Sequence, residues 1–492
     1  MTEYYLLFPL LLPFAGVPLT LFLRKKRRMQ SALALGVMLA ALGFTLALLY
    51  TVLTTREALT VQMGRWPAPF GITLIADLLG AFMLLMTHIV LVAGFVYALG
   101  STEKVVQYPT FYPLFLALSA GLSGAFLSGD LFTLFVCAEV IVLSGTALTA
   151  IADDRYGVEA AYKYFYISTL ASAFFLLGIG SLYISYGTLN LADLASRIAV
   201  NPSAPLTMAG LAFLTATFLI KGAIFPFHFW QPDFHAAAPT AVSAMLSSLV
   251  VKLGVYGLLR MITLLFAGQT SILPSLLVVL GGAGVVYGGF GAAGTHNAKR
   301  MLAYSTLAQI GFILVGIGWG TPLSLSAALV FTFNHALVKA AMLMLAGAMA
   351  SRAAVKSASF EAIIGVGKHH PFSGLLFLLG GLALAGVPPL NGFVSKFLVF
   401  WSGVQAAQYL PLALIGLASL LTLVYIIRAF IKIWFEANPE AKPKEGDRLW
   451  APAFLIALSL GLGLWPQPLV ALAQRVAAWL GDPSLYILTV LR

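Results

Sequence analysis

The sequence predicts an all-α polytopic membrane protein with about 14 transmembrane helices. Hydrophobic residues make up 60% of the 492 residues and charged residues only 9%, with a mean hydropathy of +0.96. A soluble globular chain carries roughly 25% charged residues. The apolar residues form long continuous runs, whereas a transmembrane β-barrel needs alternating segments of about ten residues. These features exclude soluble enzymes, disordered chains, disulfide-rich secreted domains and nucleic-acid-binding proteins.

Fourteen apolar runs, separated by charges or by Gly/Pro turns, are candidate spans, because about 20 apolar residues cross the hydrocarbon core of a bilayer. They lie at about residues 4–23, 30–54, 71–98, 110–127, 130–152, 160–186, 207–230, 238–266, 271–293, 301–319, 322–350, 371–403, 409–435 and 449–472. The remaining residues 473–492 form an amphipathic stretch that we expect at the membrane interface.

The distribution of basic residues predicts the orientation of these spans. Five consecutive basic residues, 24–28, follow the first run, which puts this connection in the cytoplasm and the N-terminus outside. With 14 alternating spans, eighteen of the 28 lysines and arginines, Lys442 among them, fall in or beside cytoplasmic connections, and four lie within spans. The C-terminus is then also outside. Six basic residues are expected on the outer side: Arg56, Arg65, Arg197, Arg260, Arg475 and Arg492.

The charges inside the apolar runs are the main functional signal. Each lysine at the centre of a membrane helix costs about 2.5–3.5 kcal/mol, so it must face protein or water. A buried lysine releases its proton more easily, and it regains the proton when a carboxylate approaches, so a row of such groups can pass protons. The alternative is a set of ion pairs that only fix helix packing. The residues are Lys221, Lys252, Lys339 and Lys396, with Glu139 in the middle of the fifth run.

Histidines and aspartates in the runs are accessory candidates. His335 lies four residues before Lys339, on the same helix face, and is therefore expected to be a neutral relay partner. Asp77 opens the third run. Asp130 opens the fifth run, where capping of the helix is an equal alternative.

Three further residues have a structural explanation beside the functional one. His88 is either a functional histidine or a satisfied interior one. His228 and His235, at the cytoplasmic end of the seventh run, are either proton-uptake residues or interfacial side chains. The histidine spacings and the single cysteine, Cys137, indicate no metal site. We expect no cofactor.

Prolines interrupt two of the spans. Pro226 and Pro232 follow Lys221 in the seventh span, and Pro388-Pro389 precedes Lys396 in the twelfth. A proline leaves a carbonyl without its helical partner, which in a membrane only protein or water can satisfy. Such breaks at corresponding places in two halves indicate a transporter of inverted repeats. We expect a three-helix segment over 1–109, five-helix repeats (spans 4–8 and 9–13) over 110–266 and 267–435, and a last helix with a tail over 436–492.

Five segments carry a family resemblance. They are KGAIFPFHFWQPDFHAAAPTAVSAMLSSLVVKLGVYGLLR (221–260), GDLFTLFVCAE (129–139), HNAKRMLAYSTLAQIGF (296–312), FNHALVKAAMLMLAGA (333–348) and GVPPLNGFVSKFLVF (386–400). The chain resembles the antiporter-like subunits that respiratory complex I, membrane-bound hydrogenases and Mrp-type multisubunit cation/proton antiporters share. The resemblance covers about residues 70–435. The first and last of these segments and the chain length are most similar to the D-type subunits of the Mrp antiporters.

The resemblance implies a proton-translocating subunit of a Na⁺/H⁺ antiporter in the cell membrane, which works with other membrane subunits and is a secondary transporter rather than an enzyme. By position it implies a Glu139–Lys221 ion pair, a central Lys252, then His335 and Lys339, and a terminal Lys396, along a polar axis midway across the membrane.

Two alternatives remain open. The first is a proton-pumping subunit of complex I, of the M or N type, or of a membrane-bound hydrogenase. One complex I subunit of similar length has glutamate where Lys396 stands, which favours the Mrp branch. The second is a purely structural scaffold in which the lysines can be neutralised without loss.

Overall fold

The computed structural model describes residues 2–151, 154–438 and 444–491. Lys442, Arg492 and the end of the run 130–152 lie outside these residues. The N-terminal part contains η1 (Thr2–Leu7), α1 (Phe8–Phe22), α2 (Arg27–Thr55), the antiparallel strands β1 (Leu59–Gln62) and β2 (Thr73–Ala76) around η2 (Met63–Arg65), α3 (Leu78–Leu99) and η3 (Lys104–Gln107).

The stretch expected to form the first repeat continues the helical bundle. It contains α4 (Phe111–Leu127), α5 (Leu131–Ala150), α6 (Arg155–Tyr186), α7 (Leu191–Val200), α8 (Thr207–Lys221) and α9 (Gln231–Ala237). One continuous 26-residue helix follows, composed of α10 (Thr240–Met245), the π-helical η4 (Leu246–Val250), α11 (Val251–Arg260) and η5 (Met261–Leu265).

The rest of the described chain is also helical. It contains α12 (Ile272–Gly294), α13 (Ala298–Trp319), α14 (Pro322–Arg352), α15 (Phe360–Ile363), η6 (Val366–His369), α16 (Pro371–Ala385), α17 (Asn391–Gln405) and α18 (Tyr409–Trp434). The last three helices are α19 (Trp450–Leu464), α20 (Gln467–Leu480) and α21 (Pro483–Leu491).

The all-α polytopic membrane class is confirmed. By length and composition, ten helices of the described residues can cross a membrane, or up to 12 if two bent helix pairs each count as one span. The apolar helices α4 and α8 are shorter, at 17 and 15 residues. Each of the fourteen runs contains a helix, but the number of 14 spans stays a prediction.

Three elements differ from the sequence expectations. The run 71–98 begins as strand β2, because its first residues pair with β1, and its helix starts only at Leu78. The helix α7 falls between two runs; it is short and buries only one face. The run 449–472 is two helices, α19 and α20, bent by 81° at Pro466, since a proline cannot continue a helix. In α20, Trp479 is buried against the bundle while Arg475 is exposed.

Both predicted helix breaks are confirmed. Residues 222–230 separate α8 from α9, and residues 386–390 separate α16 from α17. Gly386 has a φ of 87°, which a residue with a Cβ rarely adopts. Lys221 is the last residue of α8, and Lys396 lies in the second turn of α17. Each break therefore lies next to a buried lysine.

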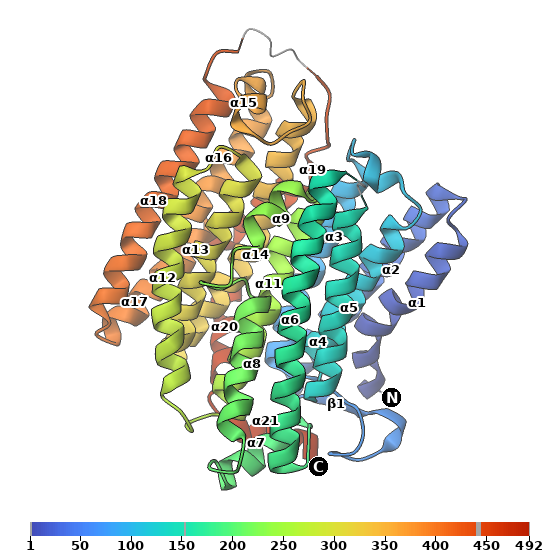
Figure 1. Cartoon of the computed structure of the whole chain (residues 1–492), viewed down its shortest axis with the longest axis vertical. Helices are drawn as coiled ribbons and strands as arrows, with labels where there is room; N and C mark the ends of the chain where they lie inside the picture. The colour runs from blue at the N-terminus through green and yellow to red at the C-terminus, as the bar shows by residue number, and fades with distance from the viewer. Residues whose placement is uncertain (1, 152–153, 439–443, 492) are drawn as a thin grey trace.

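The helix α14 lies at the centre of the bundle. It packs against α3, α10, α13, α16, α17, α19 and α20, and every residue of its most apolar 18-residue window is buried. The two chain ends lie at one end of the bundle, near β1 and α21, whereas α15 and the end of α18 lie at the other (Figure 1). The chain therefore crosses the bundle an even number of times.

Candidate functional site

Glu139 and Lys221 form an ion pair between α5 and α8. The Lys221 amine lies 3.4 Å from the Glu139 carboxylate. The lysine side chain is 4% exposed and the glutamate side chain 29%, so the pair extends from the interior of the bundle to the exposed surface of α5. The Ser172 hydroxyl of α6 donates to the same carboxylate oxygen. The serine and the lysine thus share one oxygen, which leaves the other able to take a further donor.

Lys252 and His335 make the contact between α11 and α14. The Lys252 amine hydrogen-bonds Nδ1 of His335, and both side chains are at most 1% exposed. Lys252 lies two residues after the π-helical turn η4; such turns are frequent at functional sites. Nε2 of His335 has no protein partner among the described residues. Buried polar atoms of this kind normally bond to water.

Lys339 is bonded only to neutral groups. Its amine donates to the Ser305 hydroxyl at 2.8 Å and to the Leu302 carbonyl at 3.1 Å, both on α13. The Tyr425 hydroxyl of α18 donates to Ser305 at 2.8 Å. Since Lys339 lies one turn after His335 on α14, this network continues from the Lys252–His335 contact toward α18.

Lys396 lies at the break between α16 and α17. Its amine donates to the carbonyl of Ala385, the last residue of α16, and to the Ser419 hydroxyl of α18, both at 3.1 Å. It also lies 4.8 Å from the ring centre of Phe312. At the break, the Ala385 carbonyl has no helical partner and accepts a hydrogen bond from the Lys396 amine, as the proline pattern led us to expect. Nearby in sequence, both amide atoms of buried Asn391 lack a protein partner among the described residues.

Asp77 belongs to a different ion pair. It caps the N-terminus of α3 by accepting from the Gly80 amide at 2.8 Å. Both of its carboxylate oxygens also receive a guanidinium N–H of Arg260 at 2.7 Å. Arg260, which we expected on the outer side, is a buried residue at the end of α11, about two turns beyond Lys252. Asp130, as its alternative predicted, caps α5 through the Thr133 amide at 2.6 Å.

The three accessory histidines, His88, His228 and His235, make none of the hydrogen bonds described above for the lysines. His88 bonds the Thr45 hydroxyl at 3.0 Å and the Ser123 hydroxyl at 3.3 Å, so its partners are those of a satisfied interior histidine. His228, in the break after α8, is buried against aromatic rings. His235 in α9 is fully buried, with Nδ1 3.4 Å from the Ser243 hydroxyl. Within the described residues, no group of three or more metal-ligating side chains could hold a metal ion.

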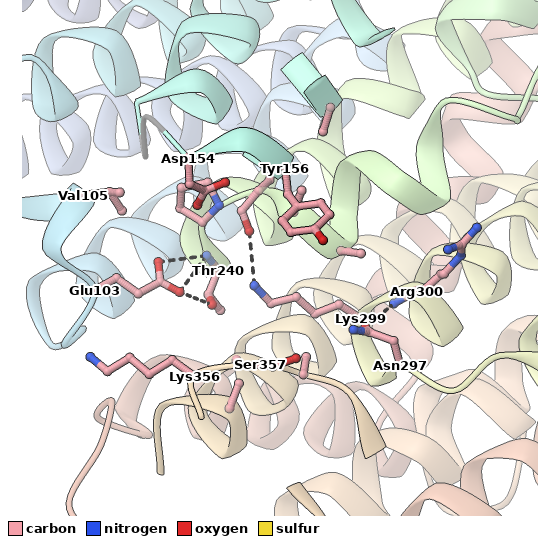
Figure 2. Close-up of a pocket in the computed structure, with 18 of the residues that line it drawn as sticks. Glu103, Val105, Asp154, Tyr156, Thr240, Asn297, Lys299, Arg300, Lys356 and Ser357 are labelled. Atoms are coloured by element: carbon pink, nitrogen blue, oxygen red, sulfur yellow. Dashed lines mark hydrogen bonds between the residues drawn. The ribbon is translucent and has the colours of Figure 1, made fainter. Parts of the chain in front are cut away.

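A cavity of about 1100 Å³ lies between the connections that precede η3, α6, α10, α13 and α15. Its wall contains a surface network in which Lys163 pairs with Glu159 at 2.7 Å and with Asp233 at 3.3 Å. Deeper in the cavity, Glu103 bonds Thr240, the first residue of α10 (Figure 2). The cavity therefore reaches the end of the helix that carries Lys252.

Comparisons with known proteins give the family of this chain. The family described as "NADH:quinone oxidoreductase/Mrp antiporter, TM" matches residues 128–422, more than half of the chain. The chain belongs to this family. The D subunit of the Na⁺/H⁺ antiporter of Alkalihalophilus pseudofirmus is 32% identical over 491 residues, which are 98% of each protein.

Two solved structures are similar to this member of the antiporter family. A chain of the membrane-bound sulfane sulfur reductase, an archaeal respiratory membrane complex, superposes with a TM-score of 0.92 at 29% identity, covering 99% of this chain and all of that one. A chain of the Mrp complex from Dietzia sp. DQ12-45-1b gives a TM-score of 0.87 at 26% identity, covering 100% and 99%. The matched family region contains all of the buried lysines and Glu139.

In this antiporter-family chain, sequence reasoning missed two kinds of residue. The burial of Arg260 could have been predicted, because this residue lies inside the apolar run 238–266 rather than beyond it. The sequence gives no indication of the hydroxyl groups in the hydrogen-bond networks around the charged residues, because serine and tyrosine are frequent in membrane helices and these contacts come from other helices. They are Ser172, Ser305, Tyr425 and Ser419.

Proposed function

We propose that this chain is the proton-translocating subunit of a multisubunit Na⁺/H⁺ antiporter of the Mrp type. One observation carries the proposal. Of the four lysines buried in spans, only Lys221 has a carboxylate partner among the described residues. Lys252, Lys339 and Lys396 are bonded to an imidazole, to hydroxyls and to carbonyls instead. A set of ion pairs that only fixed helix packing would need an acid for each lysine, because an unpaired buried charge is destabilising.

Neutral partners suit a proton relay. An imidazole or a hydroxyl can bond to a lysine in either protonation state, so each amine can be charged or neutral at modest energetic difference. His335 bonds Lys252 and lies one turn from Lys339, so it is the expected link between them. Glu139 keeps Lys221 charged, and movement of that pair changes the electrostatic energy of the next lysine.

The proposal includes location and orientation. The basic cluster 24–28 is taken as cytoplasmic, so both termini lie on the outer side of the cell membrane. In support, the loop that carries this cluster lies at the end of the bundle opposite the termini (Figure 1). The cavity beside Glu103 then opens to the cytoplasm. The two breaks, each beside a lysine, support the division into five-helix repeats over 110–266 and 267–435.

Related proteins support the antiporter branch and the partners. The relative from Alkalihalophilus pseudofirmus is named a Na⁺/H⁺ antiporter subunit, and a similar structure is part of an Mrp complex. We therefore propose that this chain functions with other membrane subunits and that the complex exchanges protons for monovalent cations, sodium first.

The test uses the complete complex in everted membrane vesicles. A pH gradient is formed, sodium, potassium or lithium is added, and the dissipation of the gradient is followed by a pH-sensitive dye. We expect a sodium-dependent response that is absent when this chain is deleted. No cation response in a fully assembled complex would contradict the antiporter assignment.

A second candidate is a proton-pumping subunit of a respiratory redox complex. It is favoured by the high TM-score of 0.92 with the chain from the sulfane sulfur reductase complex. The same residues would carry protons there, but oxidation of a substrate elsewhere in the complex would supply the energy. Acidification of the vesicle lumen during NADH or hydrogen oxidation, without a cation response, would support this candidate instead.

A further inference from the structure

Glu103 caps a helix that is not its own. Its carboxylate accepts the Thr240 backbone amide at 3.0 and 3.1 Å and the Thr240 hydroxyl at 2.5 Å (Figure 2). Thr240 is the first residue of the helix that carries Lys252, and the preceding Pro239 makes no side-chain cap. An anionic side chain at this position satisfies free amides and complements the helix dipole.

The capped threonine lies against α14. A Cβ placed on Gly347 would lie 2.1 Å from the methyl group of Thr240, so the two helices touch here with no room for a further atom. α10 and α14 pack against each other, and α14 is the helix that carries His335 and Lys339. The Glu103–Thr240–Gly347 junction therefore joins the two helices whose side chains meet at Lys252 and His335.

The junction lies at equal chain distance from both functional residues. Thr240 precedes Lys252 by twelve residues, and Gly347 follows His335 by twelve residues. Both separations correspond to about 18 Å of helix. Two antiparallel helices that touch at two points have a fixed register, and a shift at one point moves the other. The cap is thus placed to determine how Lys252 meets His335.

The loop that contains Glu103 is connected to α14 by hydrogen bonds through Asp447. Asp447, buried in the connection before α19, accepts the amide and the hydroxyl of Thr102 at 2.7 and 2.8 Å. The Asp447 amide donates to the hydroxyl of Ser351 on α14 at 3.0 Å. On the other side, Lys299 donates to the Ala238 carbonyl at 3.2 Å. These contacts hold Glu103 and the start of α10 in one place.

We propose that Glu103 is a positioning residue, which keeps Thr240 against Gly347 and so sets the register that brings Lys252 to His335. The proposal rests on the proposed function for its effect on transport. Its structural part, the cap and the register, stands independently of which ion the complex exchanges.

Hydrogen–deuterium exchange of the assembled complex tests the cap. In Glu103→Ala we expect the amides of residues 240–245 to exchange about five- to tenfold faster, while those of α4 stay unchanged. The control is Glu159→Ala, which removes an exposed carboxylate from the same cavity and leaves the cap intact. Unchanged exchange in residues 240–245 of Glu103→Ala would overturn the proposal.

Transport of the same variants tests the register. We expect Glu103→Ala to lower the maximal rate of proton flux at least tenfold without changing the half-saturating cation concentration, because the relay and not the cation site is affected. Gly347→Ala, which pushes Thr240 away from α14, should do the same. Because Thr240→Val acts through the same contact, the double variant with Glu103→Ala should be no slower than Glu103→Ala alone.

Other combinations of flux, exchange and assembly in the Glu103 variants also test the positioning role. Full flux in Glu103→Ala, with faster exchange, would overturn the positioning role although the cap exists. If Glu103→Ala does not assemble, Glu103→Gln keeps an acceptor for the Thr240 amide and should give an intermediate flux; full flux in this variant would contradict a role for the charge. A wild-type complex without cation response contradicts only the proposed antiporter, and the variants are then compared by redox-driven pumping.

Discussion

Each lysine within the spans has a different set of partners, and these partners support the proposed relay rather than a scaffold of ion pairs. Lys221 is paired with Glu139, whereas Lys339 and Lys396 bond only hydroxyls and carbonyls. An ammonium bonded to neutral dipoles in a buried site is energetically close to the neutral amine, because the dipoles offset only part of the lost hydration. This balance is what proton transfer requires.

The Glu139–Lys221 pair provides the first prediction. Glu139→Gln keeps the shape of the side chain but removes the charge that holds Lys221 protonated, so Lys221 should lose its proton rather than unfold the helix pair. We expect proton flux to fall about 100-fold or more, while the amount of assembled complex stays near that of the wild type. Normal cation-dependent flux in this variant would remove Glu139 from the mechanism.

Asp77 and Arg260 provide a contrasting prediction, because their buried bidentate pair suggests a structural role. Asp77→Asn leaves Arg260 unpaired and should destabilise the protein by about 3–5 kcal/mol, measured as a lower melting temperature of the purified complex. The double variant Asp77→Leu/Arg260→Met should regain most of the stability and the flux. A stable double variant without flux would show that Asp77 takes part in proton transfer.

The sequence identifies a buried residue when its chemistry conflicts with its surroundings. The lysines and Glu139 stand out because a charge inside an apolar run must have a reason. The burial of Arg260 was not predicted, because this residue lies near the end of its run. Glu103 gives no such signal, because it lies in a polar connection and its hydrogen-bond partner is the first residue of a helix that begins 137 residues later.

At the scale of elements, the break between α16 and α17 determines where Lys396 lies. The end of α16 and the start of α17 approach so closely that a Cβ on Gly392 would lie 1.6 Å from the Ala383 carbonyl oxygen. Only glycine allows this approach. The approach keeps the free carbonyl of Ala385 within 3.1 Å of the Lys396 amine.

Gly392→Ala should therefore separate the two helices. We expect a destabilisation of about 1–3 kcal/mol, seen as a lower melting temperature, together with a loss of flux as the lysine leaves its carbonyl. The matched control is Gly461→Ala in α19, where an added Cβ meets no atom within 4 Å. Equal behaviour of the two variants would show that the close approach does not matter.

Long apolar helices and their proline breaks could be predicted, because both depend on composition along the chain. The hairpin β1–β2 and the helix α7 could not. The strand β2 is apolar enough to be read as the start of a span, and only its partner β1 makes it a strand. The exact ends of the helices could not be predicted either, because they depend on single capping residues such as Asp77. From the sequence alone, this side chain could equally be a buried charge inside a span.

At the scale of the whole molecule, the candidate residues extend across the bundle. Glu139 and Lys396 are on α5 and α17, which lie on opposite sides of the central α14 (Figure 1). Lys252 and His335 meet between α11 and α14, and Lys339 continues toward α18. The candidate groups are therefore spread from one side of the chain to the other, as the proposed relay to neighbouring subunits would need.

The central claim is that these groups act in series. The most direct test measures the initial rate of sodium-dependent proton flux in everted vesicles with Lys221→Ala, with Lys396→Ala and with both replacements, at equal amounts of assembled complex. In a series, each single replacement blocks the whole route, so all three variants should give the flux of vesicles without the complex. A substantial flux in either single variant that disappears only in the double variant would contradict the serial relay.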